Sequence, residues 1–150
     1  LDQVRRFGVG LGVCHSEFIL TENGPVLVEI NYRSIGDGRE FLLEQLLPDG
    51  WFEPILRLHL GQPLPAITPS CRQALIQYLV AERSGRLVQE PVPPSLPGLS
   101  YTALRQTGDT LLLSHSNKDY LGVLYLQAGT AEALTQLHQD AMTAIHWEIN

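Results

Sequence analysis

The sequence predicts an α+β fold built around antiparallel strands. Two apolar stretches of strand length, residues 13–20 and 26–32, flank the short polar segment TENGP, which is the pattern of a hairpin. Residues 36–61 then show helical spacing of apolar side chains, and the second half of the chain alternates strands with loops before a closing helix. A length of 150 residues, of which 44% are hydrophobic and 17% charged, allows a sizeable core.

The chain is expected to begin with the end of an amphipathic helix. In LDQVRRF the apolar residues Leu1, Val4 and Phe7 lie around a polar face, and Gly8 ends the helix. The run GVGLG precedes a strand instead of following one and opening a helix, so we interpret it as a helix stop and not as a phosphate-binding loop. Because Leu1 is not an initiator methionine, we expect the chain to be a piece of a longer protein.

The middle of the chain is expected to contain two helices and a linker. Apolar residues recur at helical spacing on both sides of Pro48, which cannot continue a helix. The proline-rich segment QPLPAITPS follows. These features predict an N-terminal part at residues 1–62, a linker at 63–70 and a β-rich part at 71–150.

The second half is predicted to be mostly strands and loops. The segment QEPVPPSLPG contains too many prolines for the interior of any element. Thr130 is a suitable N-cap and Glu132 lies in the first turn of the closing helix, which is followed by a short strand in HWEIN. The other predicted strands lie at residues 74–80, 86–89, 110–114 and 122–127, and the apolar side of the helix contains Leu134, Leu137, Ala141 and Ile145.

Composition excludes several classes of protein. The formal net charge of −6 and the pI near 5.2 argue against nucleic-acid binding, since only Arg5 and Arg6 among the basic residues are adjacent. Cys14 and Cys71 have no metal-ligand spacing and are interpreted as reduced packing residues. No apolar run approaches the roughly 18 residues of a membrane span, and no signal peptide is recognisable. We therefore expect a soluble, cytoplasmic protein that binds neither nucleic acid nor membrane.

A polar row interrupts the apolar pattern of the second hairpin strand. Alternation along the strand places Glu29, Asn31 and Arg33 on one face. With a three-residue loop at 22–24, the preceding strand would place Glu17 directly opposite Glu29. Two carboxylates side by side repel each other unless a cation lies between them.

The residue types of this row indicate a divalent metal. Glu17, Glu29 and Asn31 offer only oxygen ligands, which suit Mg²⁺ or Mn²⁺ better than Zn²⁺. Arg33 adds a planar fork of donors for a phosphate or carboxylate oxygen. The alternative is that the row is merely the solvated face of a half-buried sheet, and the facing Glu17 argues against it.

The segment HSEFILTENGPVLVEINYRSIG resembles the metal-binding hairpin of the ATP-grasp superfamily. The resemblance is close over residues 8–61 and looser over the rest, which is similar to the β-rich appendage of the carboxylate-amine ligase branch that includes biotin carboxylase-like and amino-acid ligases. It implies an ATP-grasp C-terminal lobe, with an antiparallel sheet and flanking helices, followed by a small β-rich subdomain with a C-terminal helix. The adenine pocket and the lysine-bearing glycine loop that the family carries upstream are absent, and the only lysine is Lys118.

The resemblance also implies a function. Glu17, Glu29 and Asn31 would hold two magnesium ions that bridge the phosphates of ATP, and Arg33 would steady the transferred phosphoryl group and the acyl phosphate. The family's reaction forms an acyl phosphate from ATP and a carboxylate, and an amine or a thiol then attacks it. The expected substrates are therefore a small-molecule carboxylate and an amine, in amino-acid, peptide or siderophore biosynthesis. The chain would need the missing N-terminal region of the same protein for activity, and a homodimer is left open.

Other interpretations remain open at this stage. The chain is alternatively a non-catalytic interaction module derived from an ATP-grasp protein, or a biotin-carboxylase-like subunit. His15 shares the face of Glu17 and is interpreted first as a structural residue. After the polar row, a glycine-rich loop carries Asp37, Arg39 and Glu40, which would either contact substrate or cap the next helix. A hydrolase site is not expected at Ser114, His115 and Ser116, because the segment lacks a nucleophile elbow.

Overall fold

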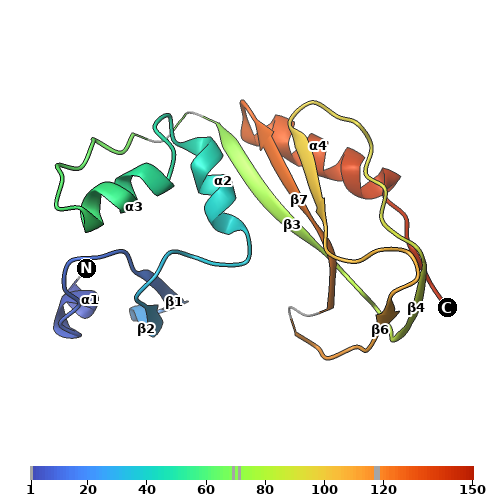
Figure 1. The fold of residues 1–150 in the computed structure, drawn as a ribbon, viewed down its shortest axis with the longest axis horizontal. Coiled ribbons are helices and arrows are strands. Elements are labelled where there is room, and N and C mark those ends of the chain that lie inside the picture. The colour runs from blue at the N-terminus through green and yellow to red at the C-terminus, as the bar shows by residue number, and fades with distance from the viewer. Residues whose placement is uncertain (1, 69, 71, 117–118) are drawn as a thin grey trace. The chain divides into compact units, whose positions relative to one another are not determined.

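The computed structural model describes residues 2–68, 70, 72–116 and 119–150. The chain divides into two compact units, Leu1–Ser70 and Cys71–Asn150, which are traced from blue to red in Figure 1. Each unit combines helices with antiparallel strands, so the predicted α+β class is confirmed. No helix among the described residues is long and apolar enough to cross a bilayer.

The first unit contains a hairpin and three helices. The helix expected at the N-terminus and the two expected around Pro48 are all present. Glu44 joins the last two helices, because its carboxylate accepts hydrogen bonds from the N–H groups of Trp51 and Phe52 in the first turn of the following helix. The elements are α1 (Asp2–Arg6), β1 (His15–Thr21), β2 (Gly24–Asn31), α2 (Arg39–Leu46) and α3 (Phe52–His59).

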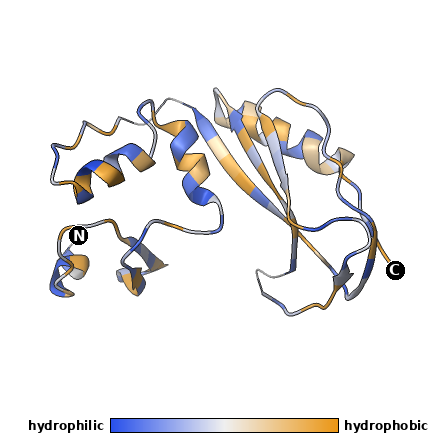
Figure 2. Ribbon diagram, viewed as in Figure 1, coloured by the Kyte–Doolittle hydropathy of each residue, from blue (hydrophilic) through white to orange (hydrophobic). Residues whose placement is uncertain are grey.

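The first unit has little hydrophobic core among its described residues. Figure 2 shows hydrophobic bands on α2 and α3, yet large apolar side chains such as Leu20 and Leu56 are mostly exposed. Phe41 and Phe52 form one aromatic pair, with ring centroids 5.9 Å apart. The fully buried large side chains of the described residues all lie in the second unit.

The second unit is a three-stranded antiparallel sheet covered by a helix. The strands β3 (Gln73–Val80) and β5 (Leu99–Ala103) both pair with the central strand β7 (Tyr120–Ala128). Helix α4 (Ala131–Ala144) packs on β7 and β3, as Figure 1 shows. A smaller sheet has the order β6 (Thr110–Leu111), β4 (Gly85–Gln89), β8 (Glu148–Ile149).

Both sheets of the second unit contribute to one core. Burying a leucine side chain stabilises a fold by about 1.5–3 kcal/mol, and five leucines here are fully buried. The predicted N-cap of α4 is present, since Thr130 Oγ1 accepts a hydrogen bond from Ala133 N at 3.2 Å. The five leucines are Leu79, Leu87, Leu121, Leu124 and Leu126.

In this unit one strand was missed and one was predicted too long. Strand β5 was not predicted, and the strand expected at 110–114 ends at Leu111. It ends there because Ser84 Oγ accepts the N–H of Leu113 at 2.8 Å and the carboxylate of Asp119 accepts the N–H of Ser114 at 2.9 Å, so side chains replace a partner strand.

Candidate metal and phosphate site

The hairpin that carries the candidate site has a tighter turn than the sequence suggested. Thr21 pairs with Gly24, so the turn is the two-residue loop Glu22-Asn23 and not the expected three-residue loop. Thr21 Oγ1 donates to Gly24 O at 2.8 Å and accepts from Asn23 N at 3.2 Å. The positive φ of Gly24, 102°, is a conformation that glycine adopts without a steric penalty.

A bulge then restores the register that the longer loop would have produced. The pairing shifts by one residue between Glu17 and Phe18, which leaves Val28 as the extra residue of β2. Glu17 consequently lies directly opposite Glu29, and His15 lies directly opposite Asn31. Residues opposite each other in an antiparallel pair share a face, so the predicted juxtaposition of the two glutamates is confirmed although its predicted cause is wrong.

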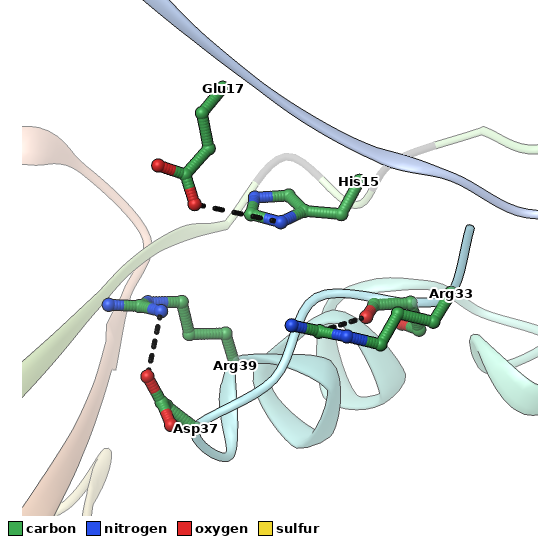
Figure 3. A network of polar contacts seen from close by, with 6 residues as sticks. His15, Glu17, Arg33, Asp37 and Arg39 are labelled. Atoms are coloured by element: carbon green, nitrogen blue, oxygen red, sulfur yellow. Dashed lines mark hydrogen bonds and ion pairs between the residues drawn. The ribbon is translucent and has the colours of Figure 1, made fainter. Parts of the chain in front are cut away.

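His15 lies beside the carboxylate of Glu17. The distance from His15 Nδ1 to Glu17 Oε1 is 3.9 Å, beyond hydrogen-bond range. The His15 side chain is 21% exposed and that of Glu17 is 53% exposed, and Nδ1 is buried without a hydrogen-bond partner in the described part of the chain. Figure 3 shows the imidazole ring next to the carboxylate.

Arg33 does not continue the polar row as the alternation suggested. Strand β2 ends at Asn31, and Arg33 N donates back to Asn31 O at 2.9 Å, which turns the chain out of the strand direction. The guanidinium of Arg33 donates from Nη1 to the carbonyl of Ser34 at 2.9 Å. Arg33 is therefore placed by the loop after the hairpin and not by the strand itself.

Two contacts tie the segment after this hairpin to other parts of the first unit. Tyr32 donates its hydroxyl to the carbonyl of Leu11, and a Cβ at Gly12 would collide with the Tyr32 ring. Trp51 Nε1 donates to Ser34 Oγ at 2.8 Å, which ties the loop after Arg33 to the start of α3. These positioning roles were not predicted from the sequence, in which the adjacency of the aromatic Tyr32 to the polar row was the available signal.

The donor set fits magnesium. Two facing carboxylates and the carboxamide of Asn31 are hard oxygen ligands, and Mg²⁺ is usually bound through one or two carboxylates together with phosphate oxygens and water. Within the described ranges, no three His, Cys, Asp and Glu side chains are grouped to hold a metal by themselves. The hairpin therefore suits a metal that shares its coordination with a phosphate ligand better than a closed structural metal site.

The SHS segment of the second unit is a structural loop. Asp119 is only 7% exposed, and its carboxylate accepts hydrogen bonds from the backbone and hydroxyl of Ser114 and from Ser116 N. Burial alone would raise the pKa of Asp119, but these hydrogen bonds and one from the backbone of His115 together lower it. The carboxylate satisfies the donors of its own loop, so the candidate hydrolase site gains no support.

Comparison with protein sequences finds one distant relative. No model of a known protein family matches the chain. An uncharacterized protein of Sinorhizobium fredii, y4rH, is 24% identical over 153 residues, which is 98% of this chain and 32% of that protein. The chain therefore spans about a third of the length of this relative.

Comparison with solved structures finds close similarity of fold. The L-amino acid ligase of Bacillus licheniformis matches with a TM-score of 0.81 at 14% identity, over 98% of this chain and 38% of that one. Phosphoribosylglycinamide synthetase of Anaerococcus prevotii matches with a TM-score of 0.78 at 14% identity, over 98% of this chain and 39% of that one. The chain spans less than two fifths of either protein.

A third match is a biotin carboxylase domain. The domain from the 2-oxoglutarate carboxylase of Hydrogenobacter thermophilus has a TM-score of 0.67 at 15% identity, over 91% of this chain and 32% of that one. That structure is a dimer in complex with magnesium ADP and bicarbonate. The chain has the fold of the corresponding part of ATP-grasp carboxylate-amine ligases, so the resemblance of the hairpin segment is confirmed at the level of the fold.

Proposed function

We propose that this chain is the C-terminal, metal-binding portion of an ATP-dependent and magnesium-dependent ligase. The ligase would join a carboxylate to an amine or a thiol through an acyl phosphate, in amino-acid, peptide or siderophore biosynthesis. In this proposal, residues 1–62 belong to the ATP-grasp lobe, residues 63–70 are the linker, and residues 71–150 form the β-rich subdomain. An upstream region of the same protein would supply the adenine pocket.

The observation that supports this proposal most strongly is the pairing of Glu17 with Glu29. Two carboxylates on directly opposite positions are unfavourable in a sheet that binds no cation. The β-bulge that produces this pairing bends the strand and is a feature typical of functional sites. With Asn31 on the same face, the arrangement offers oxygen donors to a metal, and Mg²⁺ usually takes its remaining ligands from phosphate oxygens and water.

The residues of the site have separate roles in the proposed reaction. Glu17, Glu29 and Asn31 would hold magnesium, and the ion would supply positive charge to offset that of the ATP phosphates. The guanidinium of Arg33 would bind oxygen atoms of the transferring phosphoryl group and of the acyl phosphate through its planar fork of donors. The carboxylate oxygen of the substrate attacks phosphorus, ADP leaves, and the amine or thiol then displaces phosphate from the acyl carbon.

The proposal is tested by ADP release from the full-length protein with a panel of carboxylate and amine pairs. Deleting one donor that stabilises transition-state charge reduces turnover on the order of 10²-fold or more, and we expect this loss in Arg33→Ala. Arg33 is exposed and fills no core cavity, so the melting temperature should change little. The matched control is Arg57→Ala, which removes an arginine that is bonded to Glu53 within α3 of the same unit.

The outcomes separate the proposal from its alternatives. Loss of turnover in Arg33→Ala, with normal turnover in Arg57→Ala, supports the ligase. Equal turnover in wild type and Arg33→Ala would contradict the role proposed for Arg33 in phosphoryl transfer. Absence of ADP release with every pair, together with retained folding, would favour the non-catalytic interaction module. ADP release that requires bicarbonate would favour the biotin-carboxylase-like alternative.

A further inference from the structure

One ring nitrogen of His15 is buried without a partner on the strand that carries Glu17. In the described ranges, the side-chain atoms that are buried and lack a hydrogen bond are His15 Nδ1, Glu40 Oε2, Ser70 Oγ and Tyr101 Oη, and only that of His15 belongs to the hairpin. Burying a donor or acceptor without a partner is costly, and nearly all such groups in folded proteins are satisfied. A purely structural histidine would have this nitrogen bonded, so the described fold alone does not explain it.

His15 shares its face of the hairpin with the residues of the candidate site. It lies directly opposite Asn31 and two residues before Glu17, which in turn lies directly opposite Glu29. All four side chains therefore project from one face of the two-stranded sheet. The distance from His15 Nδ1 to Glu17 Oε1 is 3.9 Å, and Figure 3 shows the imidazole and this carboxylate facing each other.

A small movement of Glu17 would satisfy the nitrogen of His15. An N–H···O hydrogen bond is about 2.9 Å long, so a shift of the carboxylate by about 1 Å would form one. The Glu17 side chain is 53% exposed and that of His15 only 21%, so the carboxylate is the partner with more freedom to rotate. A carboxylate beside Nδ1 also selects the imidazole tautomer in which Nδ1 carries the proton. His15 can therefore donate to a candidate metal ligand.

We propose that His15 is a positioning residue of the metal site, and that its Nδ1–H donates to the carboxylate of Glu17 in the metal-loaded protein. The hydrogen bond occupies one oxygen of Glu17, fixes the rotamer of the side chain and leaves the other oxygen for the ion. Ligand side chains of metals are generally held by such outer hydrogen bonds, and removing one lowers metal affinity by about 10–100-fold. This inference rests on the proposed function, because it adds a residue to the same site.

The test is binding of Mn²⁺ to the full-length protein in the presence of ADP, with the free ion followed by electron paramagnetic resonance. His15→Leu removes the donor and should weaken Mn²⁺ binding by about 10–100-fold. The side-chain amide of asparagine places an N–H close to the position of Nδ1 in histidine, so His15→Asn should restore most of the affinity. The matched control is His59→Leu, which removes an exposed histidine at the end of α3 and should bind as wild type does.

Two further measurements separate positioning from other roles of His15. Replacing an unpaired buried donor by an apolar group removes its desolvation penalty, so metal-free His15→Leu should melt at a temperature no lower than wild type. A histidine that supports the fold would instead lower it. Glutamine places its N–H near the position of Nε2, so His15→Gln should bind Mn²⁺ as weakly as His15→Leu.

Each remaining outcome contradicts the inference in a different way. Wild-type affinity in His15→Leu would show that Glu17 needs no donor, and weak binding with a lowered metal-free melting temperature would make His15 structural. Tight binding by His15→Gln with weak binding by His15→Asn would place Nε2, and not Nδ1, at the ion. If wild type itself binds no Mn²⁺ with ADP, the proposed function fails together with this inference, whereas the other outcomes overturn the role of His15 alone.

Discussion

Replacing Glu29 by glutamine should change the stability of the hairpin in opposite directions without and with magnesium. Directly opposite residues have Cβ atoms about 5 Å apart, and two unit charges at that spacing in water repel by about 0.8 kcal/mol. Screening with a Debye length of about 8 Å halves this to roughly 0.4 kcal/mol at physiological ionic strength. Water is the appropriate medium because Glu17 is 53% exposed. Glu29→Gln should therefore stabilise the metal-free hairpin.

Magnesium should reverse the order of hairpin stability between wild type and Glu29→Gln. A ligand present at about ten times its Kd stabilises the folded state by about 1.4 kcal/mol, and wild type should gain this stabilisation from magnesium ATP. Glu29→Gln keeps the shape of the side chain and removes the charge that holds the ion. The variant should thus be more stable than wild type without magnesium and less stable with it.

The assay is hydrogen exchange of the β1 and β2 amides in the full-length protein. In the absence of metal, exchange should be about twofold slower in Glu29→Gln than in wild type, and magnesium ATP should slow exchange about tenfold in wild type only. The matched control is Glu22→Gln, which removes one charge from the exposed turn of the same hairpin. The reasoning is refuted if Glu29→Gln exchanges faster without metal, or if it retains the magnesium-dependent protection.

Three further predictions concern the second unit and the chain by itself. Hydrogen bonds lower the pKa of Asp119, so the ionised carboxylate stabilises the fold above the unfolded-state pKa of about 3.9, and this stabilisation is lost as pH falls through the folded-state value. The free energy of unfolding, measured at a series of acid pH values, should therefore depend less on pH in Asp119→Asn than in wild type. Leu124→Ala leaves a cavity at a fully buried position, and urea unfolding should show a loss of about 2–5 kcal/mol. The 150-residue chain alone should bind ATP only weakly, and micromolar magnesium-dependent binding in calorimetry would show that an adenine pocket is present.

The register of the hairpin was predicted from the sequence, but its cause was not. The sequence positions of Glu17 and Glu29 fit a pairing with a three-residue loop, whereas the chain uses a two-residue turn and a bulge at Val28. Both solutions place the glutamates opposite each other, since each accounts for one extra residue. Alternation in a sequence reports which residues share a face, but it does not show where a strand is irregular.

The position of Arg33 and the strand at 110–114 show why the rest was not predictable. Both depend on backbone N–H groups that donate hydrogen bonds to acceptors other than a neighbouring strand: Arg33 N donates to Asn31 O, and Ser114 N donates to the carboxylate of Asp119. Strand β5 was missed because LSYTA follows a proline-rich loop and pairs with β7, which comes later in the chain. Long-range pairing of short segments leaves little local signal in a sequence.

The central claim, that this chain belongs to a ligase that forms an acyl phosphate, is tested most directly by trapping that species. The full-length protein is incubated with ATP, magnesium, a carboxylate panel and hydroxylamine, which attacks an acyl phosphate to give a hydroxamate and phosphate. We predict that hydroxamate and ADP form in equal amounts, that both require magnesium, and that both are lost in Glu17→Gln and Arg33→Ala. ADP formed without hydroxamate for every carboxylate, or hydroxamate formed equally by both variants, would contradict the claim.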